Sequence, residues 1–213
     1  MWIVKLIPSR ILSLQARKPS GFIGRFLMTK IFNSGNSDLN TFVKECLALE
    51  SKDIVLEIGF GPGKLINEMA TITTDGSVEG VDFSKAMLNQ AKKVNAGHIS
   101  SGRVLLHECE CSSLLFKDEV FDKLCSTNTL YFWKEPEDYF SEMFRVLRPG
   151  GKVVIGFRDD EQMCNLDLSK DIFSSFSKKD MVNLLLNVGF IDAQVKEKNG
   201  VPFVSLCGVA KKA

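Results

Sequence analysis

The sequence predicts an α/β protein with a mostly parallel sheet and helices on both faces. Between about residues 54 and 157, apolar runs of strand length alternate with segments whose apolar residues recur at helical spacing. Parallel neighbouring strands need a crossover connection, usually a helix, so this alternation is typical of a parallel sheet. The chain has 213 residues, 45% hydrophobic and 25% charged, which suits one globular domain with a full core.

The elements can be placed in order along the chain. A first helix is expected over about 39–49, with Ser37 and Asp38 in position to cap it. Strands are then expected at 54–58, 78–81, 103–107, 121–126 and 151–157, and helices at 64–72, 84–94 and 136–147.

The C-terminal part breaks this alternation. Ser177 is expected to cap a helix that continues to Val188 and stops at Gly189. Two strands follow, at 191–197 and 203–210, joined by a loop that contains Asn199 and Gly200. Asn-Gly between two strands is a strong hairpin signal. We therefore expect the otherwise parallel sheet to end in an antiparallel hairpin.

A glycine-rich turn follows the first strand, in the run VLEIGFGPG at 55–63. Glycine lets the backbone turn sharply and lets a ligand approach it closely. The next strand ends in Asp82, where a carboxylate can accept hydrogen bonds from ribose hydroxyls. The glycine-rich turn and Asp82 together predict a nucleoside-binding site. A dinucleotide fingerprint GxGxxG would need a third glycine at position 64, which is Lys64, although a nicotinamide-dependent oxidoreductase stays an alternative.

Four motifs together resemble the class I S-adenosylmethionine-dependent methyltransferases: VLEIGFGPG, GVDFSKAML at 80–88, FDKLCSTNTLYFW at 121–133 and FRVLRPGGKVVIGF at 144–157. The resemblance runs from about residue 38 to the C-terminus. Within the class, the small core is similar to the branch that includes the ubiquinone and menaquinone biosynthesis C-methyltransferases. It implies a Rossmann-like sheet of seven strands with a terminal antiparallel hairpin, and S-adenosylmethionine as cofactor.

The resemblance also implies a cofactor site. The backbone amides of the glycine loop would face the carboxylate of the ligand, Glu57 would orient its ammonium group, and Asp82 would bind the ribose. Glu110 matches the acid that receives the adenine amino group, but it stands in Cys-Glu-Cys where relatives commonly have Gly-Asp-Ala. The expected cofactor residues are Glu57, Gly59, Phe60, Gly61, Gly63, Asp82, Phe83, Met87, Glu110 and Cys111.

The acceptor side of the site is expected beyond the fourth and fifth strands, because ligands of open α/β sheets bind outside the carboxyl ends of the strands. Asn128, Tyr131 and Arg158 are the candidates there. No general base is evident, since His98 and His107 are both better explained as structural residues. Methyl transfer from a sulfonium is a displacement that positioning alone can accelerate. A phenolate, a thiolate or an enolate-like carbon would suit such a site.

The cysteine spacing and the lack of a long apolar run exclude several classes of protein. The six cysteines include no CxxC pair, so free thiols in a reducing compartment are expected, with no metal site. No apolar run reaches the ~18 residues of a membrane span. We expect a cytoplasmic protein.

The first 37 residues form a separate arm. They contain six basic residues and no acid, interleaved with apolar side chains, whereas the rest of the chain is net acidic. This mixture is typical of amphipathic helices that lie on a membrane or cover an apolar site. We expect residues 1–37 to be a substrate lid over a methyltransferase domain at 38–213. Packing alone, a membrane contact and a targeting segment stay open, and the arm contains no nucleic-acid-binding module.

The functional prediction is therefore transfer of a methyl group to a small, apolar acceptor. A nicotinamide-dependent oxidoreductase and a cofactor-binding module without catalysis are the alternatives. The oligomeric state and the acceptor atom are not determined by the sequence.

Overall fold

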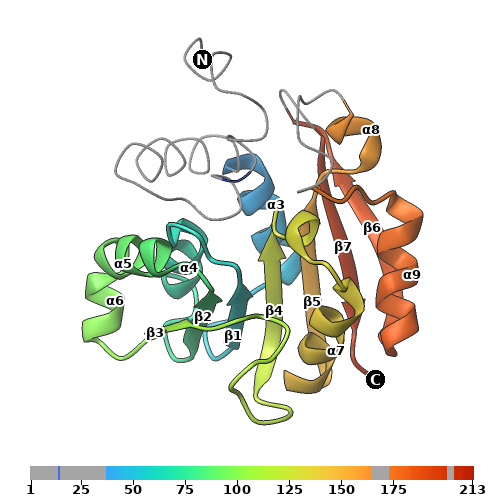
Figure 1. Ribbon diagram of the computed structural model, residues 1–213. Coiled ribbons are helices and arrows are strands. Elements are labelled where there is room, and N and C mark those ends of the chain that lie inside the picture. The colour runs from blue at the N-terminus through green and yellow to red at the C-terminus, as the bar shows by residue number, and fades with distance from the viewer. Residues whose placement is uncertain (1–13, 15–36, 165–172, 201–203) are drawn as a thin grey trace, which may run out of the picture.

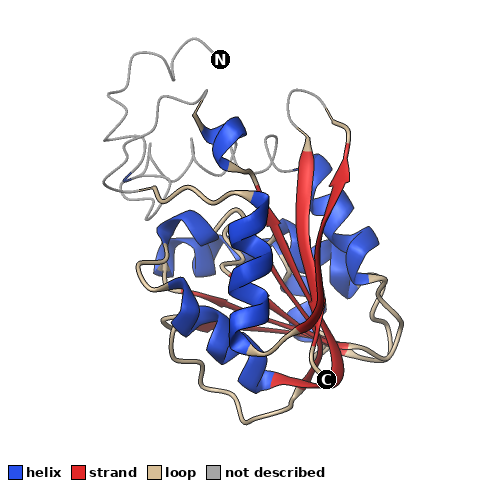
Figure 2. Cartoon of the chain, turned by 90° about the vertical axis from the view of Figure 1, so that its right-hand side faces the viewer, coloured by secondary structure: helices blue, strands red, loops and turns tan. Residues whose placement is uncertain are grey.

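The structure, a computed structural model, describes Leu14 and residues 37–164, 173–200 and 204–213. Its centre is a 7-stranded sheet in the order β3-β2-β1-β4-β5-β7-β6. The first five strands are parallel to one another, and β7 is antiparallel to both β5 and β6. Helices lie on both sides of the sheet (Figure 1, Figure 2). The predicted fold class and the terminal hairpin are confirmed.

The strands fall close to their predicted positions. They are β1 (Ile54–Ile58), β2 (Ser77–Asp82), β3 (Val104–Glu108), β4 (Phe121–Thr127), β5 (Leu147–Phe157), β6 (Ile191–Lys198) and β7 (Ser205–Lys211). The helices are α3 (Ser37–Leu47), α4 (Lys64–Ala70), α5 (Lys85–Val94), α6 (Ala96–Ser100), α7 (Pro136–Val146), α8 (Asp160–Met163) and α9 (Lys178–Val188), with the 3-10 helix η2 (Leu130–Phe132) after β4.

Two cores lie on opposite faces of the sheet. On one face α3, α4 and α5 cover alternate residues of the strands, including Val55, Cys125 and Val154. On the other face α7 and α9 cover Leu56 and Leu124, among others. Buried strand residues therefore divide between the two faces with a period of two, as expected for a sheet covered on both sides.

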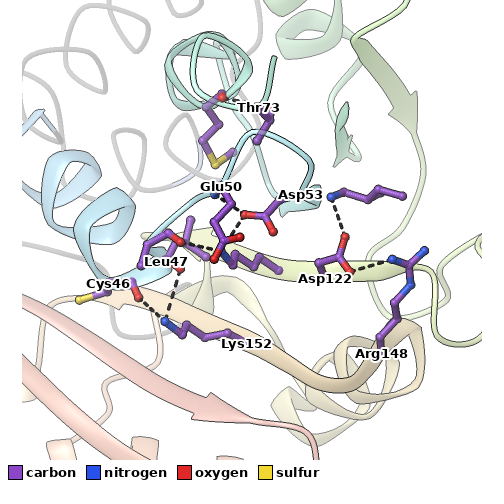
Figure 3. A network of polar contacts seen from close by, with 12 residues as sticks. Cys46, Leu47, Glu50, Asp53, Thr73, Asp122, Arg148 and Lys152 are labelled. Atoms are coloured by element: carbon purple, nitrogen blue, oxygen red, sulfur yellow. Dashed lines mark hydrogen bonds and ion pairs between the residues drawn. The ribbon is translucent and has the colours of Figure 1, made fainter. Parts of the chain in front are cut away.

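The connection from α3 to β1 lies at the amino-terminal edge of the sheet, where a polar network holds it in place (Figure 3). Lys152 Nζ donates to the carbonyl oxygens of Cys46 and Leu47 at 3.2 and 3.4 Å. These ammonium bonds satisfy carbonyls that the last helical turn leaves without partners. Asp122 accepts the N–H of Ile54 at 2.8 Å. The network lies at the edge opposite the glycine turn, so it anchors α3 without occupying the candidate site.

Some local features differ from the sequence prediction. His98, expected in a surface loop, lies in the short helix α6. His107 on β3 lies with its Nε2 2.8 Å from Glu79 Oε2 of β2, which supports its expected structural role. The arm of residues 1–37 lies almost entirely outside the described residues, and so does the proposed lid. The six cysteines are free thiols.

None of the helices within the described ranges has both the length and the apolar content needed to cross a bilayer.

Candidate cofactor site

The glycine turn after β1 takes a conformation that favours glycine at each alternate position. The φ angles of Gly59, Gly61 and Gly63 are 73°, 53° and 81°. Left-handed φ values are costly for residues with a Cβ. The three positions of the GxGxG pattern are therefore explained by backbone geometry.

The amides of these glycines bind inside the protein, which differs from the expectation that they face a ligand. Gly59 N–H donates to Val81 O at 2.8 Å, and Gly63 N–H donates to Phe60 O at 3.0 Å. Gly61 N–H donates to Asp82 Oδ2 at 2.9 Å. The glycine amides therefore hold the loop in place against β2. A ligand would meet the surface of the loop and not these three N–H donors.

Packing around the loop separates the three glycines by role. A Cβ on Gly59 would overlap the methyl group of Thr129, and a Cβ on Gly63 would lie 2.6 Å from the Cβ of Ala91. A Cβ on Gly61 would meet no atom of the protein within 4 Å. The open space beside Gly61 is where a ligand can press against the backbone.

Two buried acids stand at the ends of the neighbouring strands β1 and β2. Glu57 is 3% exposed and Asp82 is 5% exposed. Burial raises the pKa of Glu57 well above its usual value, and the nearby charges of Asp82 and Glu68 raise it further. Burial also raises the pKa of Asp82 to about 6, against the lowering effect of the N–H donors of Ser84 and Gly61. Buried acids with raised pKa values mark candidate functional sites.

The expected adenine residues follow β2. Phe83 is half-buried. Met87 is buried in α5, where its N–H faces the Oγ of the N-cap Ser84 at 3.5 Å. Phe60 differs from its neighbours in the loop, because its side chain is buried in the core and lies where a Cβ on Gly80 would be. Only the backbone of Phe60 is therefore available to a ligand.

The Cys-Glu-Cys segment after β3 places its side chains in different surroundings. Glu110 is exposed and accepts a hydrogen bond from the hydroxyl of Tyr139 at 3.2 Å. Cys111 is buried, and burial together with the charge of Asp82 raises the pKa of its thiol. The structure therefore brings Cys111 close to the acid at the end of β2 and holds Glu110 toward α7.

On the acceptor side, a buried phenol links the ends of β4 and β5. Tyr131 OH donates to Asn128 Oδ1 at 2.9 Å and accepts the backbone N–H of Arg158 at 2.5 Å. Asn128 has a φ of 55°, a conformation uncommon for a residue with a Cβ. These bonds join all three acceptor-side candidates into one cluster.

Three residues that the sequence analysis did not select complete the site. Asn95, between α5 and α6, is fully buried, and its Nδ2 donates to Gly63 O at 3.0 Å. Ser126 Oγ donates to Ile58 O at 2.7 Å and also hydrogen-bonds Thr129. The glycine loop is thus held from the end of α5 by Asn95, from β4 by Ser126 and from the turn after β4 by Thr129. A polar residue within an apolar helix or strand is the only sequence signal for them.

The buried carboxylates of the site fit a cationic nucleoside. Glu57 Oε2 is buried and has no hydrogen-bond partner within the described part of the chain. A buried carboxylate atom in this state is stabilised by a cation that also donates a hydrogen bond. The sheet order, the open glycine loop and the two strand-end acids together define a nucleoside-cofactor enzyme with the methyltransferase sheet.

Comparisons with known proteins agree with this assignment to a methyltransferase fold. A family model described as a methyltransferase domain matches residues 56–155. The chain is 30% identical over 182 residues to the uncharacterized methyltransferase YdaC of Bacillus subtilis, a match that covers 85% of this chain and 96% of that protein. It is 30% identical over 112 residues to the ubiquinone/menaquinone biosynthesis C-methyltransferase UbiE of Geobacter sulfurreducens, covering 52% of this chain and 44% of UbiE.

A solved structure shares the fold at low sequence identity. Phosphoethanolamine N-methyltransferase 2 of Haemonchus contortus, in complex with phosphomonomethylethanolamine and S-adenosylhomocysteine, has a TM-score of 0.75 and 19% identity, covering 97% of this chain and 61% of that one. The chain belongs to the class I S-adenosylmethionine-dependent methyltransferases. It is an enzyme that uses S-adenosylmethionine, and the nicotinamide alternative is set aside.

Proposed function

We propose that this methyltransferase acts on a small acceptor with an apolar body, and that it binds its cofactor between the glycine loop and the ends of β1, β2 and β3. The observation that carries the proposal is the pair of buried acids, Glu57 and Asp82, beside the open space at Gly61. S-adenosylmethionine, when bound, supplies an electrophilic methyl group on a sulfonium.

The residues of the chain would then bind and orient this ligand. Asp82, at the end of β2, would accept hydrogen bonds from the ribose hydroxyls. Glu57 would accept a hydrogen bond from the ammonium group with its buried Oε2. Phe83 and Met87 would flank the adenine, and Cys111 would line the same side with the backbone of Glu110.

The acceptor would lie beyond β4 and β5, next to Asn128, Tyr131 and Arg158. Tyr131 is an unsuitable proton acceptor, because burial raises the pKa of its phenol well above its usual value. Its two hydrogen bonds instead fix the backbone around the methyl-accepting face. Positioning and exclusion of water would therefore supply the rate, without a general base.

The basic, apolar arm at 1–37 would cover the acceptor, since a core of this size has no inserted substrate domain. Its composition also suits contact with an anionic membrane surface, which would make a cytoplasmic enzyme membrane-peripheral. Both roles are proposals on residues that lie outside the described ranges, apart from Leu14 and Ser37.

Isothermal titration with S-adenosylmethionine tests the cofactor site. Asp82→Ala should weaken binding at least tenfold at neutral pH, because charge-assisted hydrogen bonds to the ribose are lost. Asp192→Ala is the matched control, since Asp192 is an acid on β6 whose side chain is 63% exposed. Equal affinity in the two variants would remove Asp82 from the site.

A further inference from the structure

Two buried oxygen atoms at the carboxyl ends of β1 and β4 have no hydrogen-bond partner within the described part of the chain. They are Glu57 Oε2 and Thr127 Oγ1. Both side chains are more than nine-tenths buried, since Glu57 is 3% exposed and Thr127 is 9% exposed. Buried polar groups nearly always have a partner, and an unpaired one calls for a ligand or a bound water. The two atoms therefore indicate where a ligand group binds.

The strand register places the two side chains on one face of the sheet. Glu57 of β1 pairs with Cys125 of β4, and Thr127 follows Cys125 by two residues. Side chains alternate along a strand, so Thr127 projects to the same face as Cys125 and Glu57. This is the face that α3 covers, because Cys125 packs there in one core with residues of α3. Glu57 and Thr127 are therefore diagonal neighbours on adjacent strands.

The spacing between the two residues suits one small group that bridges them. Neighbouring strands lie about 4.8 Å apart and rise about 3.3 Å per residue, so the two Cα atoms are roughly 8 Å apart. The threonine side chain is short, and the oxygens of Glu57 and Thr127 do not pair with each other. A group with two or more hydrogen-bond donors can satisfy both oxygens at once.

The surroundings of Glu57 favour a positively charged group. Burial raises the pKa of this carboxyl, and the charges of Asp82 and Glu68 raise it further, whereas the backbone N–H of Ile66 lowers it. A cation that donates hydrogen bonds would compensate the negative charges around Glu57, which a water molecule cannot do. An ammonium group has three N–H donors, enough for Glu57 and for a second acceptor.

The neighbouring hydroxyls of the same segment are already used inside the protein. Ser126 Oγ donates to Ile58 O at 2.7 Å and also hydrogen-bonds Thr129. Of these three hydroxyls, the one on Thr127 is left for a ligand.

We propose that the Thr127 hydroxyl accepts a hydrogen bond from the ammonium group of S-adenosylmethionine, beside Glu57, and so helps to select a cofactor with a free α-amino group. This inference rests on the proposed function, which assigns only Glu57 to that group. A threonine hydroxyl can accept a hydrogen bond, whereas a valine of nearly the same shape cannot. The hydroxyl is unpaired in the ligand-free protein and paired in the complex, so its contribution appears on binding.

Isothermal titration with two ligands tests this role. The ligands are S-adenosylhomocysteine and its analogue with hydrogen in place of the α-amino group. Thr127→Val should weaken binding of S-adenosylhomocysteine about tenfold, the size expected of one hydrogen bond to a charged group, and should change binding of the deaminated analogue less than about twofold. Thr127→Ser keeps the hydroxyl and should bind S-adenosylhomocysteine within about threefold of the wild-type protein.

Thermal melts of the ligand-free protein separate a ligand-binding role from a structural one. Thr127→Val replaces an unpaired buried hydroxyl with a methyl group, so it should keep or raise the melting temperature. The matched control is Thr74→Val, which removes an exposed hydroxyl from the loop before β2 and should change the affinity for neither ligand.

The outcomes separate this inference from the proposed function. If S-adenosylhomocysteine does not bind the wild-type protein, the proposed function fails and this inference fails with it. If it binds, three results overturn the inference alone. They are an unchanged affinity in Thr127→Val, as expected where the hydroxyl holds only a buried water, an equal loss of affinity for both ligands, and a melting temperature that Thr127→Val lowers.

Discussion

Cofactor affinity should depend on pH through Asp82. Burial raises the pKa of this carboxyl to about 6 in the ligand-free protein. Ribose hydroxyls donate best to the ionised carboxylate, so below that pKa a proton must leave before the ligand binds. The cost is about 1.4 kcal/mol, or about tenfold in affinity, for each pH unit. We therefore expect affinity to fall about tenfold between pH 7 and pH 5, and Glu57, whose pKa is also raised, acts in the same direction.

The assay is isothermal titration with S-adenosylhomocysteine from about pH 5 to pH 8, in buffers of different ionisation enthalpy. Binding should release protons near pH 6, and the number released follows from the buffer dependence of the heat. Asp82→Asn is neutral throughout this range. It should bind at least tenfold more weakly at pH 7.5 and should lose the part of the pH dependence that Asp82 causes. A constant dissociation constant with no proton release, or an unchanged slope in the variant, would refute the reasoning.

The same pKa shift affects stability with the opposite sign. The folded-state pKa of Asp82, about 6, lies above the usual value of 3.8, so the folded protein binds the proton more tightly than the unfolded chain does. The contribution of Asp82 to stability is therefore greatest below about pH 4 and falls by about 3 kcal/mol as pH rises through 6. Thermal melts of the ligand-free protein at each pH therefore show whether weaker binding at low pH comes from the site rather than from unfolding.

The remaining predictions concern the loop and the arm. Gly61→Val should no longer bind S-adenosylmethionine, because the space beside Gly61 would be filled, and its φ of 53° should also lower the melting temperature. Gly59→Ala should lower the melting temperature through the same strain and through overlap with a neighbouring methyl group. Asn95→Ala should lower the free energy of unfolding by about 1–3 kcal/mol, since the fully buried side chain of Asn95 donates a hydrogen bond to Gly63 O. Chemical denaturation measures this change, and an unchanged free energy of unfolding would contradict the prediction. Deleting residues 1–30 should leave cofactor binding intact by titration and abolish turnover, and the full chain should bind anionic vesicles more tightly at low salt than at high salt. Full activity of the truncated protein would exclude the lid, and salt-independent binding would exclude the membrane contact.

Local signals in the sequence were enough to predict the elements. Ser177 caps α9 with a capping box, and Gly189 ends the helix at a φ of 108°, as its residue type favours. The position of the two buried acids could also be predicted, because Glu57 is the next-to-last residue of β1 and Asp82 ends β2, and parallel strands bring their carboxyl ends to one edge. Their role in binding the cofactor stays a prediction. These predictions depend only on residue type, spacing and the direction of the strands.

Residues far apart in the sequence decided the rest. Asn95 holds the glycine loop from 32 positions away, and Thr129 packs against Gly59 from the turn that follows β4. Phe60, expected at the ligand, turns into the core against Gly80, because the tight turn directs its side chain inward. The sequence carries no local signal for such contacts, since they depend on which elements lie next to each other.

The hairpin illustrates the same division. Its two strands follow from their sequences, and even their difference is visible, since β7 is almost wholly buried whereas β6 is mostly exposed. Only the tertiary structure places β7 between β5 and β6, with Cys207 beside Gly156. Hydrogen bonds between strands can form in many orders with similar local energies. Burial of the apolar faces against α3 and α9 selects this order, and with it the edge at which the candidate site is built.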